Sequence, residues 1–163
     1  LREVLGVLRD DSGAGASAQA PQPTLAALPE LLDQNAAAGT VVHSRTAPTV
    51  AEALSTLPDS TARNAFRIIQ ESLTNARRHA PGTTVELAMD GVPGERLTVR
   101  VSNAVVAGGT TPSLHGDHSS GSLPSSGHGL PGLVERARLA GGELTHGVED
   151  GRFTVTAWLP WTA

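Results

Sequence analysis

The amino-acid sequence predicts an α+β fold, a two-layer α/β sandwich in which helices pack on one face of a mixed β-sheet. The first observation is a change of hydrophobic period, from helical spacing before Pro81 to strict alternation over residues 83–90 and 96–103. The second is the order of the elements along the chain, which is helix, strand, helix, two strands, helix and hairpin. No internal repeat interrupts this order. A single sheet covered by helices accounts for both observations.

Composition limits the classes of function. The chain has 163 residues, 39% of them hydrophobic, no cysteine and a formal net charge of −4. This length suits one globular domain. The negative charge and the dispersed basic residues disfavour binding to nucleic acid, and the lack of cysteine excludes disulfides and thiolate metal sites. No apolar run approaches the roughly 20 residues that cross a bilayer, so we expect no membrane contact from this stretch.

The first 23 residues are expected to lie outside the globular domain. Residues 1–9 carry Val4, Leu5 and Leu8 at helical spacing, which indicates the end of a helix that begins upstream. Residues 10–23 are small, polar and rich in Pro and Gly, which is typical of a linker. We therefore expect a fragment of a longer protein, with the globular domain at residues 24–163.

Helical spacing and turn residues place the elements of that domain. A short helix is predicted after Thr24, with Gly39 as its stop, followed by a strand over residues 40–46. A long helix starts near Asp59 or Ser60 as the N-cap and ends before Pro81.

The second half of the chain is predicted to be richer in strands. Two strands, at residues 83–90 and 96–103, precede a loop at residues 104–126 that has no usable period. A helix follows the glycines near residue 130 and stops at Gly141 and Gly142. The chain ends in a hairpin that turns at Asp150 and Gly151.

The long helix separates a core side from a polar side. At about 100° per residue, Glu71, Asn75 and Arg78 fall opposite the core side, with His79 at the edge. One interpretation is a solvated face on which Arg67 pairs with Glu71. The other is a site, because a carboxylate can accept a proton, an amide oxygen can ligate Mg²⁺ and a guanidinium can bind phosphate. The core side carries five residues, Phe66, Ile69, Leu73, Ala76 and Ala80.

A glycine-rich stretch favours the second interpretation. Gly127, Gly129 and Gly132 lie in "GHGLPGL", directly before a predicted helix. Such glycines are often plain loop residues. In this position, however, they would let backbone N–H groups face a phosphate, and the long preceding loop could fold over a nucleotide.

These two stretches resemble a known family. "FRIIQESLTNARRHA" resembles the N box of bacterial sensor histidine kinases, and "GHGLPGLVERARLAGGEL" resembles their second glycine box and the following helix. The sequence of the first stretch is most similar to the subgroup that signals to response regulators of the NarL/LuxR type, common in actinobacteria. The resemblance runs from about residue 25 to 159. It implies the ATP-binding sandwich shared with gyrase, Hsp90 and MutL, with residues 1–9 as the end of a dimerisation helix and 104–126 as the ATP lid.

The resemblance also implies roles for individual residues. Glu71 would be the general base that activates the phosphoacceptor histidine, and Asn75 would ligate the Mg²⁺ that bridges the ATP phosphates. Arg78 stands at a basic phosphate contact, with His79 on the same turn. The second glycine box, where backbone amides meet the phosphates, corresponds to Gly127, His128, Gly129, Leu130 and Gly132.

The first glycine box of that family is altered in this chain. Asn103 occupies the position of the aspartate that accepts the adenine amino group, and Val105 and Ala107 replace two glycines. Asparagine can still accept through its carbonyl oxygen. It loses a charge-assisted hydrogen bond, at a cost of about 1 kcal/mol.

The resemblance implies a kinase that transfers the γ-phosphoryl group of ATP to a histidine upstream of this chain, for relay to a response regulator. It further implies a cytoplasmic location and a homodimer formed through the missing dimerisation helices. One alternative is a non-catalytic docking module of the same fold, which the altered first glycine box favours. A serine kinase that acts on anti-sigma antagonists is a second alternative, disfavoured by the helical lead-in at residues 1–9.

Overall fold

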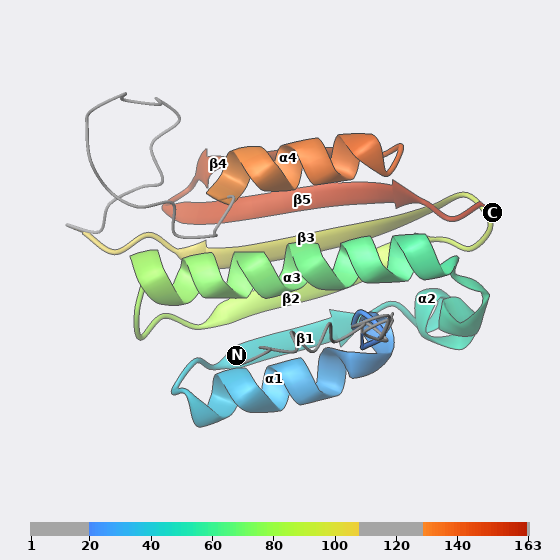
Figure 1. Ribbon diagram of the computed structural model, residues 1–163. Helices are drawn as coiled ribbons and strands as arrows, with labels where there is room; N and C mark the ends of the chain where they lie inside the picture. Colours follow the sequence, from blue (N-terminus) through green and yellow to red (C-terminus); the bar gives the residue numbers. More distant parts are fainter. Residues whose placement is uncertain (1–19, 108–128, 163) are drawn as a thin grey trace, which may run out of the picture.

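The computed structural model describes residues 20–107 and 129–162 (Figure 1). The predicted helix over residues 1–9, most of the predicted linker and the loop from residue 108 onward lie outside these ranges. So do Gly127 and His128 of the glycine-rich stretch.

A five-stranded mixed sheet forms one layer of the molecule. The strand order is β1-β2-β3-β5-β4, with β1 parallel to β2 and all other pairs antiparallel. This arrangement confirms the predicted fold class. Each strand that the sequence indicated is present, at β1 (Val42–Thr46), β2 (Val85–Val92), β3 (Arg96–Ala104), β4 (Glu143–Glu149) and β5 (Arg152–Pro160).

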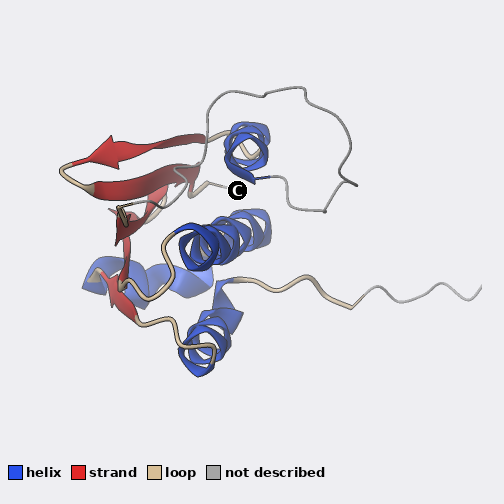
Figure 2. Ribbon diagram, turned by 90° about the vertical axis from the view of Figure 1, so that its left-hand side faces the viewer, coloured by secondary structure: helices blue, strands red, loops and turns tan. Residues whose placement is uncertain are grey.

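Three helices form the second layer. The helices α1, α3 and α4 lie side by side on one face of the sheet, and α2 lies beyond the end of β1 (Figures 1 and 2). The predicted helix after Thr24 begins as the 3₁₀ helix η1 and continues as α1. The sequence did not predict α2 or the 3₁₀ helix η2, which are too short to show a hydrophobic period. The helical bounds are η1 (Leu25–Ala27), α1 (Leu28–Ala37), α2 (Pro48–Ala53), η2 (Leu54–Thr56), α3 (Asp59–His79) and α4 (Gly129–Leu139).

The N-cap of α3 lies one residue before the first of its two predicted positions, Asp59 and Ser60. Pro58 occupies the N-cap position, so no side chain caps the helix, and Asp59 lies in the first turn. A carboxylate there still interacts favourably with the positive end of the helix dipole. The predicted end is confirmed, because the helix stops at His79, and Gly82 adopts a positive φ of 79° just beyond Pro81.

Alternating strand residues and one side of α3 make up the core. All five residues predicted for the core side of α3 are buried. Beneath them lie the inward-facing residues of the three central strands, which are Val85, Leu87, Met89, Leu97, Val99, Val101, Val155, Ala157 and Leu159. The predicted alternation is therefore confirmed in β2, β3 and β5.

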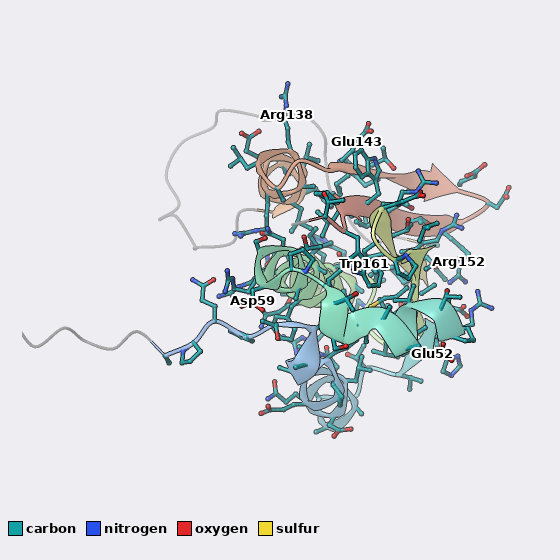
Figure 3. All side chains as sticks on the ribbon, turned by 90° about the vertical axis from the view of Figure 1, so that its right-hand side faces the viewer. Glu52, Asp59, Arg138, Glu143, Arg152 and Trp161 are labelled. Atoms are coloured by element: carbon teal, nitrogen blue, oxygen red, sulfur yellow. The ribbon has the colours of Figure 1, made fainter. Side chains whose placement is uncertain are left out.

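Trp161 closes one end of the sandwich. Its side chain is 3% exposed and donates Nε1–H to Oγ1 of Thr56 at 3.1 Å (Figure 3). This end carries the start of α3 and the end of β5. The opposite end therefore holds the end of α3, where the sequence places its candidate site.

Candidate functional site

Three elements bring the predicted site residues to one end of the molecule. Helix α3 and strand β3 run in the same direction and end at the same edge, and α4 begins there (Figure 1). The described chain leaves this edge at residue 107 and returns at residue 129. Residues that are far apart in the sequence thus share one end of the sandwich.

Asn75 is the most buried polar residue of the predicted set on α3. It is 7% exposed, and its amide has no hydrogen-bond partner within residues 20–107 and 129–162. Among the described residues, Ser72 Oγ alone is a fully buried side-chain polar atom without a partner, so the amide of Asn75 keeps some contact with solvent. A ligand can therefore reach this amide without breaking a hydrogen bond of the fold. Its oxygen is a donor of the type that Mg²⁺ prefers.

The burial of Asn75 corrects the predicted two-sided helix. The sequence placed Asn75 opposite the core side, yet Ile68 and Ser72, on the same flank, are also buried. Helix α4 packs against α3, so α3 is covered on two sides. The polar side predicted from the sequence is therefore narrower in the structure and borders a second buried flank.

Glu71 lies one helical turn before Asn75 and is half-buried. The pairing with Arg67 that the solvated-face interpretation requires is absent, because Arg67 Nη1 donates to Oε1 of Gln70 at 3.2 Å. Within the described residues the Glu71 carboxylate makes no hydrogen bond or ion pair. It is free to accept a proton or to hold a polar ligand.

Two basic residues occupy the last turn of α3. Arg78 is exposed, and His79 is half-buried. On a helical wheel Arg78 lies within about 20° of Glu71, about two turns closer to the edge where α4 begins. An exposed guanidinium at this edge can move to meet a phosphate oxygen without breaking a contact of the fold.

Asn103 supplies a hydrogen-bond acceptor on the inner face of β3. It is 5% exposed and pairs in register with Val85 on one side and Phe153 on the other. Its Nδ2 donates to the carbonyl oxygen of Ala104 at 2.9 Å. A carbonyl cannot donate, so this bond fixes the amide orientation and leaves Oδ1 as the acceptor for another group.

The described part of the glycine-rich stretch forms the start of α4. Gly129 is its first residue, and a Cβ there would meet no atom within 4 Å. The Leu130 side chain is 5% exposed and belongs to the core, so only its backbone can serve a ligand. The N–H groups of Gly129, Leu130 and Gly132 fall among the first four of the helix, which lack partners within it, while Pro131 has no N–H. This helix start can bind an anion.

Sequence reasoning missed one polar residue on the same flank of α3. Ser72 is 4% exposed, and its hydroxyl has no hydrogen-bond partner in the part of the chain that the structure describes. The missing information is the packing of α4, which a helical wheel of α3 alone does not contain.

Other classes of site find no match in the described residues. Residues 20–107 and 129–162 contain no group of three or more His, Asp or Glu side chains that could hold a metal ion. None of the described helices has the length and apolarity needed to cross a membrane.

Comparisons with known proteins identify the family of the chain. Residues 61–163 match the family of histidine kinase-, DNA gyrase B- and HSP90-like ATPases, a stretch that includes every predicted site residue. The methanol utilization control sensor protein MoxY of Paracoccus denitrificans is 32% identical over 93 residues, which are 56% of this chain and 19% of that relative. This chain thus spans about a fifth of the relative's length.

Solved structures share the fold at low sequence identity. The blue-light activated histidine kinase of Erythrobacter litoralis EL346 has a TM-score of 0.57 and 19% identity, over 86% of this chain and 42% of that chain. The histidine kinase domain of the E. coli osmosensor EnvZ has a TM-score of 0.54 and 18% identity, over 85% of this chain and 86% of that chain. These likenesses concern the fold.

Proposed function

Because the chain belongs to the family of histidine kinase-, DNA gyrase B- and HSP90-like ATPases, we propose that it is the ATP-binding catalytic domain of a two-component sensor histidine kinase. The observation that carries this proposal is the pair Glu71 and Asn75 on α3. Glu71 is half-buried, Asn75 is 7% exposed as a residue, and neither side chain has a hydrogen-bond partner in the described chain. Both groups are therefore available to a ligand at the end of α3.

The residues fit Mg·ATP along the length of the site. Asn75 would hold Mg²⁺ through its amide oxygen, and the metal would neutralise the charge that develops on the phosphates. The free N–H groups at the start of α4, together with Arg78, and His79 on the same turn, would bind the phosphates. Asn103 would accept a hydrogen bond from the adenine amino group. The nucleotide would thus lie between α3, β3 and α4.

Glu71 gives the proposed reaction its base. In phosphoryl transfer to histidine, the bond between the γ-phosphorus and the bridging oxygen of ADP breaks, and a phosphorus–nitrogen bond forms to the imidazole. Glu71 would accept the N–H proton of the other imidazole nitrogen, which makes the attacking nitrogen more nucleophilic and leaves the phosphorylated ring neutral. The protein otherwise positions the reactants and neutralises charge.

The phosphoacceptor and the partners belong to a longer protein. We place the acceptor histidine on a dimerisation helix upstream of residue 1, in a homodimer, and the next transfer on an aspartate of a NarL/LuxR-type response regulator. The amino-acid sequence of residues 66–80 supports this subgroup. The relative MoxY is named as a control sensor protein.

The altered first glycine box, at Asn103, Val105 and Ala107, favours a second function. The N–H of Val105 donates to the carbonyl oxygen of Gly151 at 2.8 Å, so the chain continues alongside β5 just after Asn103. The glycines that the family has in this stretch are absent. The second candidate is therefore a regulatory docking module that keeps the fold without transferring phosphate.

A phosphorylation assay separates these two functions. A protein extended to include the upstream dimerisation helices is incubated with Mg²⁺ and γ-labelled ATP. The kinase function predicts acid-labile label on a histidine of those helices. ATP binding without any transferred label would favour the docking module.

A further inference from the structure

Ser72 carries a hydroxyl that the fold does not use. The oxygen is buried and has no hydrogen-bond partner among residues 20–107 and 129–162. Helical Ser and Thr side chains commonly bond the carbonyl four residues earlier, and Thr74 does so with Gln70 at 3.0 Å. Because a buried hydroxyl without a partner is unfavourable, the position of Ser72 calls for a ligand.

The hydrogen bond of Thr61 shows which way this flank of α3 faces. Thr61 Oγ1 donates to the carbonyl oxygen of Pro160, at the end of β5, at 2.9 Å. Ser72 lies eleven positions further along α3, and at 3.6 residues per turn the two side chains point within about 20° of each other. Ser72 therefore also faces β5.

The position along β5 follows from the rise of each element. Helix α3 and strand β5 run in opposite directions (Figure 1). Eleven helical residues advance about 16 Å, which equals about five strand residues. Counted back from Pro160, this places Ser72 over the region of Val155, which pairs with Val101 on β3. Asn103 is two residues further along β3, toward the site.

The surroundings of Ser72 suit a flat aromatic ligand. Val101 and Val155 are 3% and 2% exposed and present apolar side chains on the inner face of the sheet. Ala76, one turn after Ser72 on the same flank, has only a methyl group. Two complementary polar atoms border this apolar region, Oδ1 of Asn103, an acceptor, and Oγ of Ser72, which can donate one hydrogen bond.

We propose that Ser72 is a specificity-determining residue, whose O–H donates to N1 of adenine, directly or through one water, while Asn103 Oδ1 accepts from the adenine amino group. The inference rests on the proposed function, ATP binding. An acceptor beside a donor is complementary to the Watson–Crick edge of adenine. Guanine presents the reverse pattern, with an oxygen where adenine has its amino group, so Asn103 Oδ1 would face a second acceptor.

The test compares Mg·ATP with Mg·1-deaza-ATP, in which a C–H replaces N1. Calorimetric titrations use the full chain and the Ser72→Ala variant. We expect the unaltered chain to bind ATP roughly fivefold to tenfold more tightly than 1-deaza-ATP, the value of one hydrogen bond. Ser72→Ala should bind both nucleotides equally, at the weaker affinity, with little change in its affinity for GTP.

Two further variants control the comparison. Thr74→Ala removes a hydroxyl from the same helix, but one that bonds Gln70, and should keep the full preference for ATP. Ser72→Cys keeps the size of the side chain with a weaker donor, and should give an intermediate preference. Without nucleotide, Ser72→Ala should unfold at the same temperature as the unaltered chain or higher, because the lost hydroxyl has no partner.

The outcomes distinguish this inference from the proposed function. If the unaltered chain shows no saturable ATP binding, the proposed function fails and this inference with it. If the unaltered chain binds ATP and Ser72→Ala keeps the preference over 1-deaza-ATP, only the role of Ser72 is overturned.

Discussion

Arg67 donates a hydrogen bond from Nη1 to Oε1 of Gln70 at 3.2 Å, which turns the guanidinium away from an ion pair with the next residue, Glu71. The described part of the chain offers the Glu71 carboxylate no other partner. The Glu71 carboxylate, beside Asn75 on the same helix, is therefore available to accept a proton. The first prediction tests this role.

Glu71→Gln should separate binding from transfer. In the protein extended with its dimerisation helices, we expect ATP affinity within about twofold of the unaltered protein and autophosphorylation slower by about a hundredfold or more, the usual contribution of a general base. Glu86→Gln, an exposed change on β2, is the matched control and should leave both unchanged. An equal loss of binding and transfer in Glu71→Gln would make Glu71 a ligand-holding residue instead.

Asn75→Ala should abolish Mg²⁺-dependent ATP binding without destabilising the fold. The amide of Asn75 makes no hydrogen bond with the described residues, so the substitution removes none. We expect a melting temperature without nucleotide equal to or above that of the unaltered chain, and no increase in ATP affinity when Mg²⁺ is added.

Asn35 is the matched control for that variant. It is also 7% exposed, but its Nδ2 donates to the carbonyl oxygen of Leu31 in α1 at 2.8 Å. Asn35→Ala should therefore lose about 1 kcal/mol of stability in urea denaturation and keep its ATP affinity. Reversed behaviour of the two variants would contradict the assignment of Asn75 as a metal ligand.

Asn103→Asp should strengthen ATP binding about fivefold, because the charged acceptor gives about 1 kcal/mol more to the adenine amino group. The stability of the nucleotide-free protein should fall, since the carboxylate would be buried at a position that is 5% exposed. Isothermal titration and thermal unfolding check the two effects. Unchanged or weaker ATP binding would show that adenine does not contact residue 103.

Gly142→Ala tests the packing of the terminal hairpin. Gly141 adopts a φ of 80° directly after α4, and a Cβ on Gly142 would collide with the carbonyl oxygen of Trp158. We expect a loss of about 1–3 kcal/mol in urea denaturation, typical of forced overpacking. Gly147→Ala, where a Cβ meets nothing within 4 Å, should cost far less.

Features set by local chemistry could be predicted from the sequence. Alternation along β3 and β5 defined their buried faces, and Pro81 with Gly82 marked the end of α3, because each signal depends on neighbouring residues alone. The predicted N-cap of α3 differs from the observed one. On propensity, Asp59 or Ser60 is a better N-cap than Pro58, but in the structure the helix already begins at Asp59.

Features that depend on packing between elements could not be predicted. The wheel of α3 placed Glu71 and Asn75 together but gave no sign that α4 would bury Asn75 and Ser72. The bond from Asn103 Nδ2 to Ala104, which leaves Oδ1 as the free acceptor, likewise depends on side-chain geometry that a residue type does not reveal.

The most direct test of the central claim is a calorimetric titration of the chain with ATP, once in the presence of Mg²⁺ and once in the presence of EDTA. A nucleotide site built on Asn75 predicts saturable binding of one ATP per chain that is much tighter with Mg²⁺ than without it. The absence of saturable ATP binding under both conditions would contradict the claim.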